Sequence, residues 1–186
     1  MLILASRSPR RREILTCAGI PHLVRAAEVD ETIRDGEGAE EYVKRVARAK
    51  AEAVEADPGD VVLGADTVVV VGSEILGKPA DEADARRMLR SLAGREHIVM
   101  TGICLRHAGG VVEHAESTTV RFLPLSAEEI DAYVASGEPM DKAGAYAIQG
   151  LASKFIDRIE GCYFNVVGLP VAKVYSLLRR MVTPAM

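Results

Sequence analysis

Near its N-terminus the chain reads SRSPRRR over residues 6–12, directly after a short apolar run. Ser8 followed by Pro9 is typical of a helix N-cap and first helical position, so we expect the amides of Ser8, Arg10 and Arg11 to be free at the positive end of a helix. Such a helix start binds phosphate, and adjacent guanidiniums strengthen the binding. Two alternatives remain: a solvated arginine face, and a phosphorylation site, for which the ordered character of the segment gives no support.

The segment LGADTVVV at residues 63–70 places Asp66 within a β-rich apolar run. Burying this carboxylate is costly unless a cation, a metal ion or a water-activating role compensates for it. The alternative interpretation is a turn between two strands, with Ala65 and Asp66 at its tip.

Two lysines are further candidates for phosphate contacts. Lys78 lies in the tripeptide GKP, at residues 77–79, although Gly-Lys-Pro is also typical of an exposed turn. Lys50 falls near the apolar face of a predicted helix, where a lysine that extends its ammonium to solvent is the commoner explanation.

The segment MDKAGAYAIQG at residues 140–150 combines small residues with hydrogen-bonding side chains. Gln149 carries both a donor and an acceptor, so it can recognise the edge of a nucleotide base. Tyr146 and Ile148 resemble anchors to a core, which disfavours the alternative of a flexible surface loop.

Apolar periodicity and capping residues assign these segments to an α/β fold. We expect one elongated mixed β-sheet flanked by helices, with two lobes around a cleft, in a single domain over residues 1–186. Strands are expected at residues 2–5, 22–26, 60–71 (in two runs), 97–107, 111–122 and 154–159, and helices at residues 10–18, 39–56, 81–92, 126–135 and 168–181.

Composition narrows the functional classes. The net charge of −4 and the absence of Trp disfavour a general nucleic-acid binder, so any basic site must be local. Three widely separated cysteines indicate a reducing cytoplasm, and no apolar run reaches the ~20 residues that cross a membrane. We interpret the four histidines as exposed or packing residues rather than ligands: His22, His97, His107 and His114.

The ordered set LASRSPRR, VDET, ARAK, GADTVV, GKP, DKAGAYAIQG and GCYFNVVGLP resembles the Maf family of nucleoside triphosphate pyrophosphatases, over nearly the whole chain. The resemblance implies hydrolysis of a nucleoside triphosphate to the monophosphate and pyrophosphate. It also implies a fold similar to that of inosine triphosphate pyrophosphatases (Maf/Ham-type), a divalent cation, a homodimer and a link to inhibition of septum formation. The Gln-bearing loop resembles the branch that acts on dTTP and UTP, rather than the sister branch that prefers 7-methyl-GTP.

The resemblance also implies roles for individual residues. Asp66 matches the family's proton acceptor, and three positions match residues for substrate choice: Arg10, Thr67 and Gln149. Five positions match polar residues that line the family's cleft: Ser6, Arg11, Glu31, Lys50 and Lys78. Together with Ser8, they form the predicted site.

The predicted mechanism assigns Mg²⁺ or Mn²⁺ to Glu31 and Asp66, because hard cations prefer carboxylate and water ligands. Asp66 orients or deprotonates the attacking water, while Arg11, Lys50 and Lys78 stabilise charge on the phosphates. The remaining alternatives are a nucleic-acid-binding regulator, a nucleotide-binding regulator of cell division without required catalysis, and a pyrophosphatase of purine or 7-methyl-GTP substrates.

Overall fold

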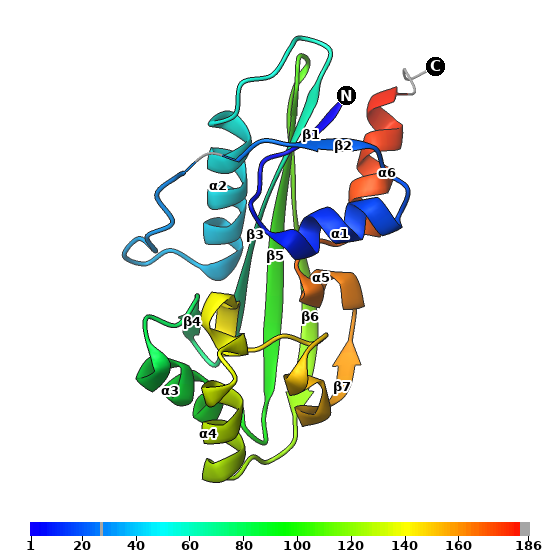
Figure 1. Cartoon of the computed structure of the whole chain (residues 1–186). Helices are drawn as coiled ribbons and strands as arrows, with labels where there is room; N and C mark the ends of the chain where they lie inside the picture. The colour runs from blue at the N-terminus through cyan, green and yellow to red at the C-terminus, as the bar shows by residue number, and fades with distance from the viewer. Residues whose placement is uncertain (27, 183–186) are drawn as a thin grey trace. The chain divides into compact units, whose positions relative to one another are not determined.

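The computed structural model describes residues 1–26 and 28–182. Helices and strands alternate along most of the chain, as Figure 1 shows. In chain order the elements are β1 (Leu2–Leu4), α1 (Pro9–Cys17), β2 (His22–Val24), α2 (Ala39–Glu52), β3 (Val61–Val71), β4 (Glu74–Leu76), α3 (Glu82–Leu92), β5 (Glu96–His107), β6 (Gly110–Phe122), α4 (Ala127–Ala135), the 3₁₀ turns η1 (Glu138–Asp141), η2 (Ala143–Ala145) and η3 (Leu151–Phe155), β7 (Ile156–Glu160), α5 (Tyr163–Val167) and α6 (Val171–Val182).

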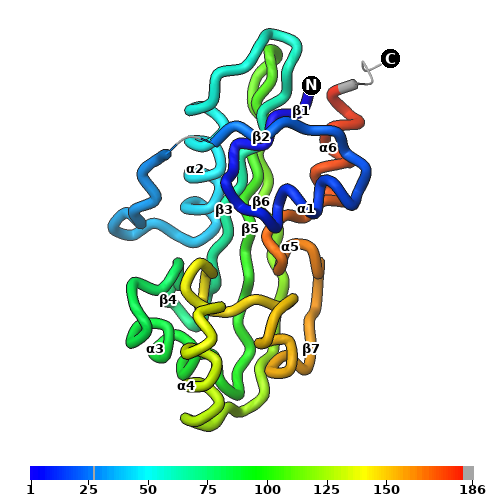
Figure 2. The backbone as a smooth tube through the Cα atoms, in the orientation of Figure 1, coloured from blue at the N-terminus to red at the C-terminus, as the bar shows by residue number. Residues whose placement is uncertain are grey.

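The strands form a mixed seven-stranded sheet in the order β2-β1-β3-β5-β6-β7, with β4 paired to β3. Strand β1 is parallel to both neighbours, so that Leu2 lies opposite His22 on one side and Val61 on the other. The pairs β3/β4 and β6/β7 are antiparallel. Figure 2 shows the long strands β3, β5 and β6 side by side. The predicted mixed α/β architecture is therefore confirmed.

The chain divides into two compact units, in agreement with the predicted two lobes. The first unit comprises Met1–Asp66, Thr101–Glu116 and Gly168–Met186, and the second comprises Thr67–Met100 and Ser117–Val167. Each unit has its own apolar cluster. The cluster of the first includes Ile3, Ala47, Ala51, Val62 and Cys104. The cluster of the second joins α3 and α4 to the strands and includes Met88, Leu89, Phe122, Ile130 and Tyr133.

Two glycines allow helix α2 to lie directly on the sheet of the first unit. A Cβ atom on Gly64 of β3 would lie 2.0 Å from the carbonyl oxygen of Ala47, and one on Gly102 of β5 would lie 2.3 Å from that of Val43. Since real Cβ atoms do not approach backbone so closely, glycine at both positions sets the distance between helix and sheet. Figure 1 shows α2 beside β3.

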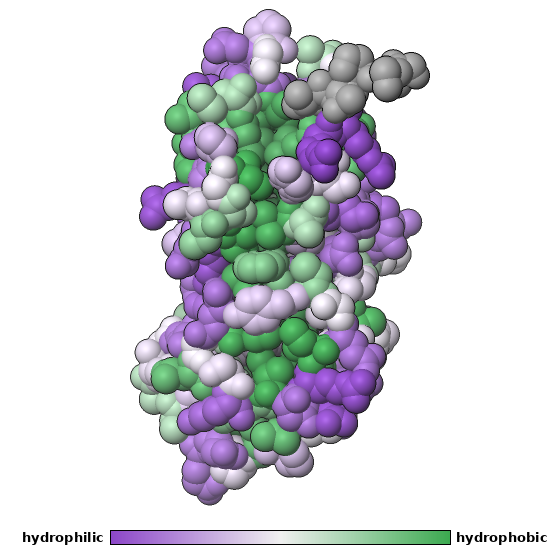
Figure 3. Space-filling view, turned by 90° about the vertical axis from the view of Figure 1, so that its right-hand side faces the viewer, coloured by the Kyte–Doolittle hydropathy of each residue, from purple (hydrophilic) through white to green (hydrophobic). Residues whose placement is uncertain are grey.

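Several large apolar side chains remain exposed on both units, among them Leu23, Val24 and Tyr175 of the first unit and Tyr163 and Phe164 of the second. Figure 3 shows that hydrophobic surface reaches solvent on the face it draws. Exposed apolar residues of this size are candidates for contact with another protein surface.

The structure corrects four local expectations. Residues 61–71 form one continuous strand through Asp66, so the alternative of a turn at Ala65 and Asp66 is wrong. Helix α2 ends at Glu52 rather than at residue 56, and α6 begins only after Pro170. The short elements β4 and α5 were not predicted, because three and five residues are too few to show a period.

Replacing Gly64 by Ala should lower the free energy of unfolding by about 3 kcal/mol, because the new methyl group overlaps the backbone of α2. The matched control is Gly59→Ala, where a Cβ meets nothing within 4 Å. Urea denaturation of the three proteins measures the difference. Equal stability of the two variants would show that α2 can move without cost.

Candidate functional site

In the first unit, three charged side chains converge around strand β3. Asp66 is only 6% exposed, and its Oδ1 accepts a hydrogen bond of 2.7 Å from Nζ of Lys50 on α2. The same ammonium lies 2.8 Å from Oε1 of Glu31. A further side chain supports the cluster, because the Tyr42 hydroxyl donates to the Glu31 carbonyl oxygen over 2.8 Å. The lysine thus compensates for the buried carboxylate, which also explains why β3 continues through Asp66.

The two carboxylates fit a divalent cation. Both approach one common position, where the Lys50 ammonium now lies. Among the residues that the structure describes, no group of three or more His, Cys, Asp and Glu side chains is placed to hold a metal. Mg²⁺ and Mn²⁺ are hard cations, and Mg²⁺ is commonly held by one or two carboxylates that leave its remaining positions to water and substrate phosphate. The donor set of Glu31 and Asp66 is therefore suited to such an ion.

Arg11 connects three parts of the first unit through its buried guanidinium. Its Nε donates to the carbonyl oxygen of Gly168 over 2.8 Å, and its Nη1 donates to that of Ala65 over 2.8 Å and to Oγ of Ser6 over 3.1 Å. Burial lowers the pKa of Arg11, and the negative charge of Asp66 opposes this effect. The guanidinium of Arg11 therefore places positive charge next to the carbonyl group of Ala65, the residue directly before Asp66.

The predicted N-cap of α1 is confirmed, but the expectation that the amides of Ser8 and Arg11 are free is wrong. The Ser8 hydroxyl accepts from the Arg11 amide over 3.5 Å, which is a long hydrogen bond. The Ser8 amide itself donates to Oγ of Ser6 over 3.2 Å. Since side-chain oxygens occupy these two amides, the helix start offers fewer donors to a phosphate than the sequence pattern predicts.

In the second unit, the GKP tripeptide and the Gly- and Ala-rich segment lie together. The Gly144 amide donates to the carbonyl oxygen of Gly77 over 3.0 Å, and Lys78 follows as an exposed residue. Gly144 and Ala145 are both left-handed, with φ of 67° and 59°. This conformation is costly for alanine, so the surrounding contacts must hold it in place. Thr67 is half-buried and Gln149 is exposed.

His97 and Tyr146 form a buried pair that anchors this segment. Nε2 of His97 lies 2.8 Å from the Tyr146 hydroxyl, and both rings pack edge-on against Phe122. Burial lowers the pKa of His97 to about 4. The interpretation of His97 as a packing residue and of Tyr146 as an anchor is confirmed. Their hydrogen bond was not predicted, because the two residues are far apart in sequence.

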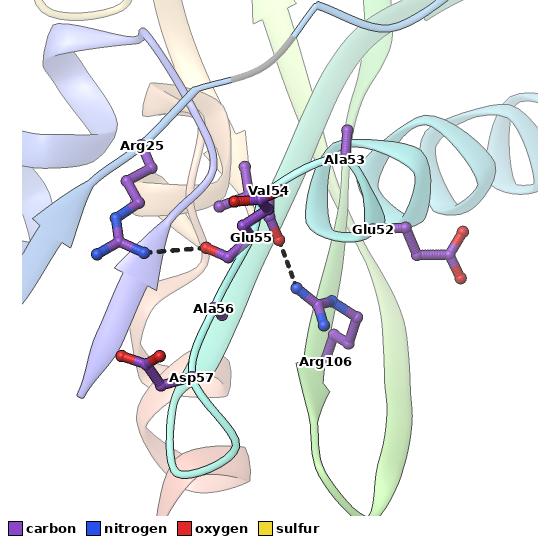
Figure 4. Close-up of a pocket in the computed structure, with 8 residues that line it drawn as sticks. All are labelled: Arg25, Glu52, Ala53, Val54, Glu55, Ala56, Asp57 and Arg106. Carbon is purple, nitrogen blue, oxygen red and sulfur yellow. Dashed lines mark hydrogen bonds between the residues drawn. The ribbon is translucent and has the colours of Figure 1, made fainter.

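A pocket of about 600 Å³ in the first unit lies apart from the predicted residues (Figure 4). Its lining is Arg25, Arg106 and residues 52–57. Arg25 donates to the carbonyl oxygen of Glu55 over 2.9 Å, and Arg106 donates to those of Ala51 and Val54. The arginines thus satisfy carbonyl groups at and after the end of α2, a structural role that is common at helix C-termini.

Comparisons with known proteins identify the family of the chain. The family model of the Maf-like proteins matches residues 1–181, and the chain therefore belongs to the Maf-like protein family. Among its relatives, the dTTP/UTP pyrophosphatase of Anaeromyxobacter sp. (strain Fw109-5) is 55% identical and aligns over 96% of this chain and 88% of its own. The protein of the same name from Koribacter versatilis is 52% identical, over 96% and 93% of the two chains.

Solved structures show the same fold at low sequence identity. The Ham1 protein of Staphylococcus aureus has a TM-score of 0.55 and 14% identity, covering 97% of this chain and 98% of its own. A HAM1 protein from Coxiella burnetii has a TM-score of 0.51 and 14% identity, covering 96% and 98%. The expected Ham-type fold is confirmed.

Replacing Arg11 by Lys should lower the free energy of unfolding by about 2–3 kcal/mol. An ammonium cannot reproduce the planar fork that serves Ser6, Ala65 and Gly168 together, and an unsatisfied buried carbonyl is costly. The matched control, Arg12→Lys on the exposed side of α1, should change it by less than about 0.5 kcal/mol. Thermal and urea denaturation measure both, and equal effects would contradict a cross-linking role for Arg11.

The buried His97 should make the protein less stable in mild acid. Its pKa is about 4 in the folded protein, whereas an unperturbed histidine has a pKa of 6.5, so the unfolded chain binds more protons between these values. Stability should therefore fall by about 2 kcal/mol between pH 7 and pH 5. The variant His97→Gln, which keeps a hydrogen-bonding group but does not titrate, should lose this pH dependence. An unchanged slope in the variant would assign the effect to other groups.

Proposed function

We propose that this protein is a nucleoside triphosphate pyrophosphatase that hydrolyses dTTP and UTP, or modified pyrimidine nucleotides, to the monophosphate and pyrophosphate. The observation that carries the proposal is the buried Asp66, held by Lys50 next to Glu31, in a chain whose relatives are named dTTP/UTP pyrophosphatases. A buried carboxylate held beside a second one is suited to act as the base at a metal-assisted phosphoryl site.

In the proposed reaction, Asp66 orients a water molecule and accepts its proton while the water oxygen attacks the α-phosphorus. The bond from that phosphorus to the oxygen bridging toward the β-phosphate breaks, and pyrophosphate leaves with the electron pair. Lys50 fixes the rotamer of Asp66 through its 2.7 Å hydrogen bond. Glu31 and Asp66 would hold the Mg²⁺ or Mn²⁺ ion. When bound, this cation would neutralise phosphate charge and lower the pKa of a coordinated water.

The remaining predicted residues would either bind the phosphates of the substrate or recognise its base or sugar. Lys78 and Arg11 would stabilise charge on the phosphates, with Ser6 and Ser8 contributing to substrate binding. Three residues would determine the choice of base or sugar: Arg10, Thr67 and Gln149. The exposed position of Gln149 supports its part of the proposal, because the side chain is accessible to a ligand.

The wider setting of the enzyme is also proposed. We infer a homodimer in the cytoplasm, and the exposed Tyr163 and Phe164 of the second unit support a surface there that another subunit covers. Within the part of the chain that the structure describes, no helix has the length and apolarity needed to cross a membrane. That residues 1–186 act as one domain, and that the protein influences septum formation, stay predictions.

Replacing Asp66 by Asn should reduce pyrophosphate release from dTTP and UTP by at least about 100-fold, because the amide cannot accept the proton. The fold should survive, since the amide oxygen can still accept from Lys50. The measurement is pyrophosphate release from a panel of triphosphates with Mg²⁺ or Mn²⁺, with circular dichroism to confirm folding.

The exposed Asp35→Asn is the matched control and should retain wild-type rates. Activity of Asp66→Asn near that of the wild type would remove Asp66 from the reaction. Release from purine triphosphates alone would keep the reaction but overturn the role of Gln149. No release from any triphosphate by the wild type would overturn the proposed function.

A further inference from the structure

Gln149 lies in a short irregular segment between η2 and η3, formed by residues 146–150. Its side chain is exposed, so its position depends on the backbone on either side. Neither a helix nor a strand supplies a regular hydrogen-bond ladder here. The contacts that the second unit makes with this backbone therefore determine where Gln149 is presented.

At its N-terminal side the segment is fixed by two tyrosines. The Tyr146 hydroxyl pairs with His97 in the core. The next amide, that of Ala147, donates to the hydroxyl of Tyr133 over 3.3 Å. Tyr133 is 3% exposed and lies on α4, so its hydroxyl is a fixed point of the second unit.

At its C-terminal side the segment is fixed by the carboxylate of Glu138. Oε2 accepts from the Leu151 amide over 3.0 Å, and Oε1 accepts from the Tyr133 hydroxyl over 2.8 Å. Glycine at position 150 makes this approach possible, because a Cβ there would lie 2.2 Å from Oε1. One carboxylate thus connects the tyrosine that holds Ala147 to the amide two residues beyond Gln149.

The backbone of Glu138 is itself held. Its amide donates to Oγ of Ser136 over 3.3 Å, and its carbonyl oxygen accepts from Nζ of Lys142 over 3.0 Å. Within the irregular segment, the Gly150 amide donates to the carbonyl oxygen of Ala147 over 3.2 Å and closes the turn that presents Gln149. The carboxylate and the turn therefore form one connected network.

We propose that Glu138 is a positioning residue for base selection: its carboxylate clamps residues 147–151 against Tyr133 and thereby holds Gln149 in the orientation that recognises a pyrimidine. This inference rests on the proposed function, because it requires that Gln149 contacts the base. The proposal does not require Glu138 to contact the substrate. Its effect on the reaction passes through the backbone that it holds.

The experiment is a double-mutant cycle on substrate preference. Pyrophosphate release is measured with dTTP and with dGTP for the wild type, Glu138→Ala, Gln149→Ala and the double variant. We expect each single variant to lose about 10-fold or more of the preference in kcat/KM for dTTP over dGTP, mainly through a higher KM for dTTP. The double variant should be no worse than Gln149→Ala, because both changes remove the same recognition.

Two further variants separate positioning from general damage. Glu138→Gln should restore most of the preference, because its amide oxygen can accept from Leu151 while its N–H group donates to the Tyr133 hydroxyl. Glu128→Ala is the matched control on α4, since that carboxylate hydrogen-bonds to Ser126 and its own backbone. It should leave the preference unchanged. Additive losses in the double variant, or preserved preference in a folded Glu138→Ala, would overturn the proposal.

Amide hydrogen exchange distinguishes failure of this inference from failure of the proposed function. In Glu138→Ala, exchange should accelerate at residues 147–151 and remain unchanged in α3 and in the first unit. Unchanged exchange at residues 147–151 would overturn the clamp whatever the enzyme hydrolyses. If Gln149→Ala keeps the wild-type preference for dTTP over dGTP, Gln149 does not select the base. The proposal is then wrong even if Glu138→Ala accelerates exchange at residues 147–151. If the wild type hydrolyses no triphosphate, the proposed function and the role in base selection both fall.

Discussion

The arrangement of Glu31, Lys50 and Asp66 in the first unit depends on one buried charge in the middle of a strand, which a neighbouring charge compensates. A carboxylate at 6% exposure costs several kcal/mol unless a partner offsets its lost hydration, and Lys50 is that partner. Because of this cost, the positions of the residues that surround the Asp66 carboxylate are tightly constrained. The lysine must come from a helix that lies close to the strand, and that closeness is set by Gly64 and Gly102.

The same pair of charges connects stability with the proposed chemistry. Lys50 is bound to both carboxylates that the proposed reaction assigns to a divalent cation. A cation entering this position must displace the ammonium or share the carboxylates with it. In the proposed reaction the ammonium keeps its hydrogen bond to Asp66, so a bound cation would share the carboxylates with Lys50 rather than replace it.

Much of the fold was predictable because its signals are local. The Ser8 cap and the periodic helices depend on neighbouring residues. The long-range pairs were not predictable from periodicity, because they join residues that lie apart in sequence: Arg11 with Gly168, Lys50 with Asp66 and His97 with Tyr146. The apolar run around Asp66 in the sequence indicated that a buried carboxylate there needs a partner, but only the fold identifies Lys50 as that partner. The amides of Ser8 and Arg11 were wrongly expected to be free for a local reason, because the side-chain oxygens of Ser6 and Ser8 accept hydrogen bonds from them.

Ala145 ends η2 and directly precedes residues 146–150, the segment that carries Gln149. Its backbone is left-handed, a conformation that glycine would adopt at less cost, yet its methyl group is fully buried in the apolar cluster of the second unit. Packing thus maintains a conformation that the isolated chain avoids. The start of the segment is consequently fixed in the folded protein, which lowers the conformational entropy that binding of a ligand there would have to remove. Any reshaping of the backbone at Ala145 would require this methyl group to leave the apolar cluster of the second unit.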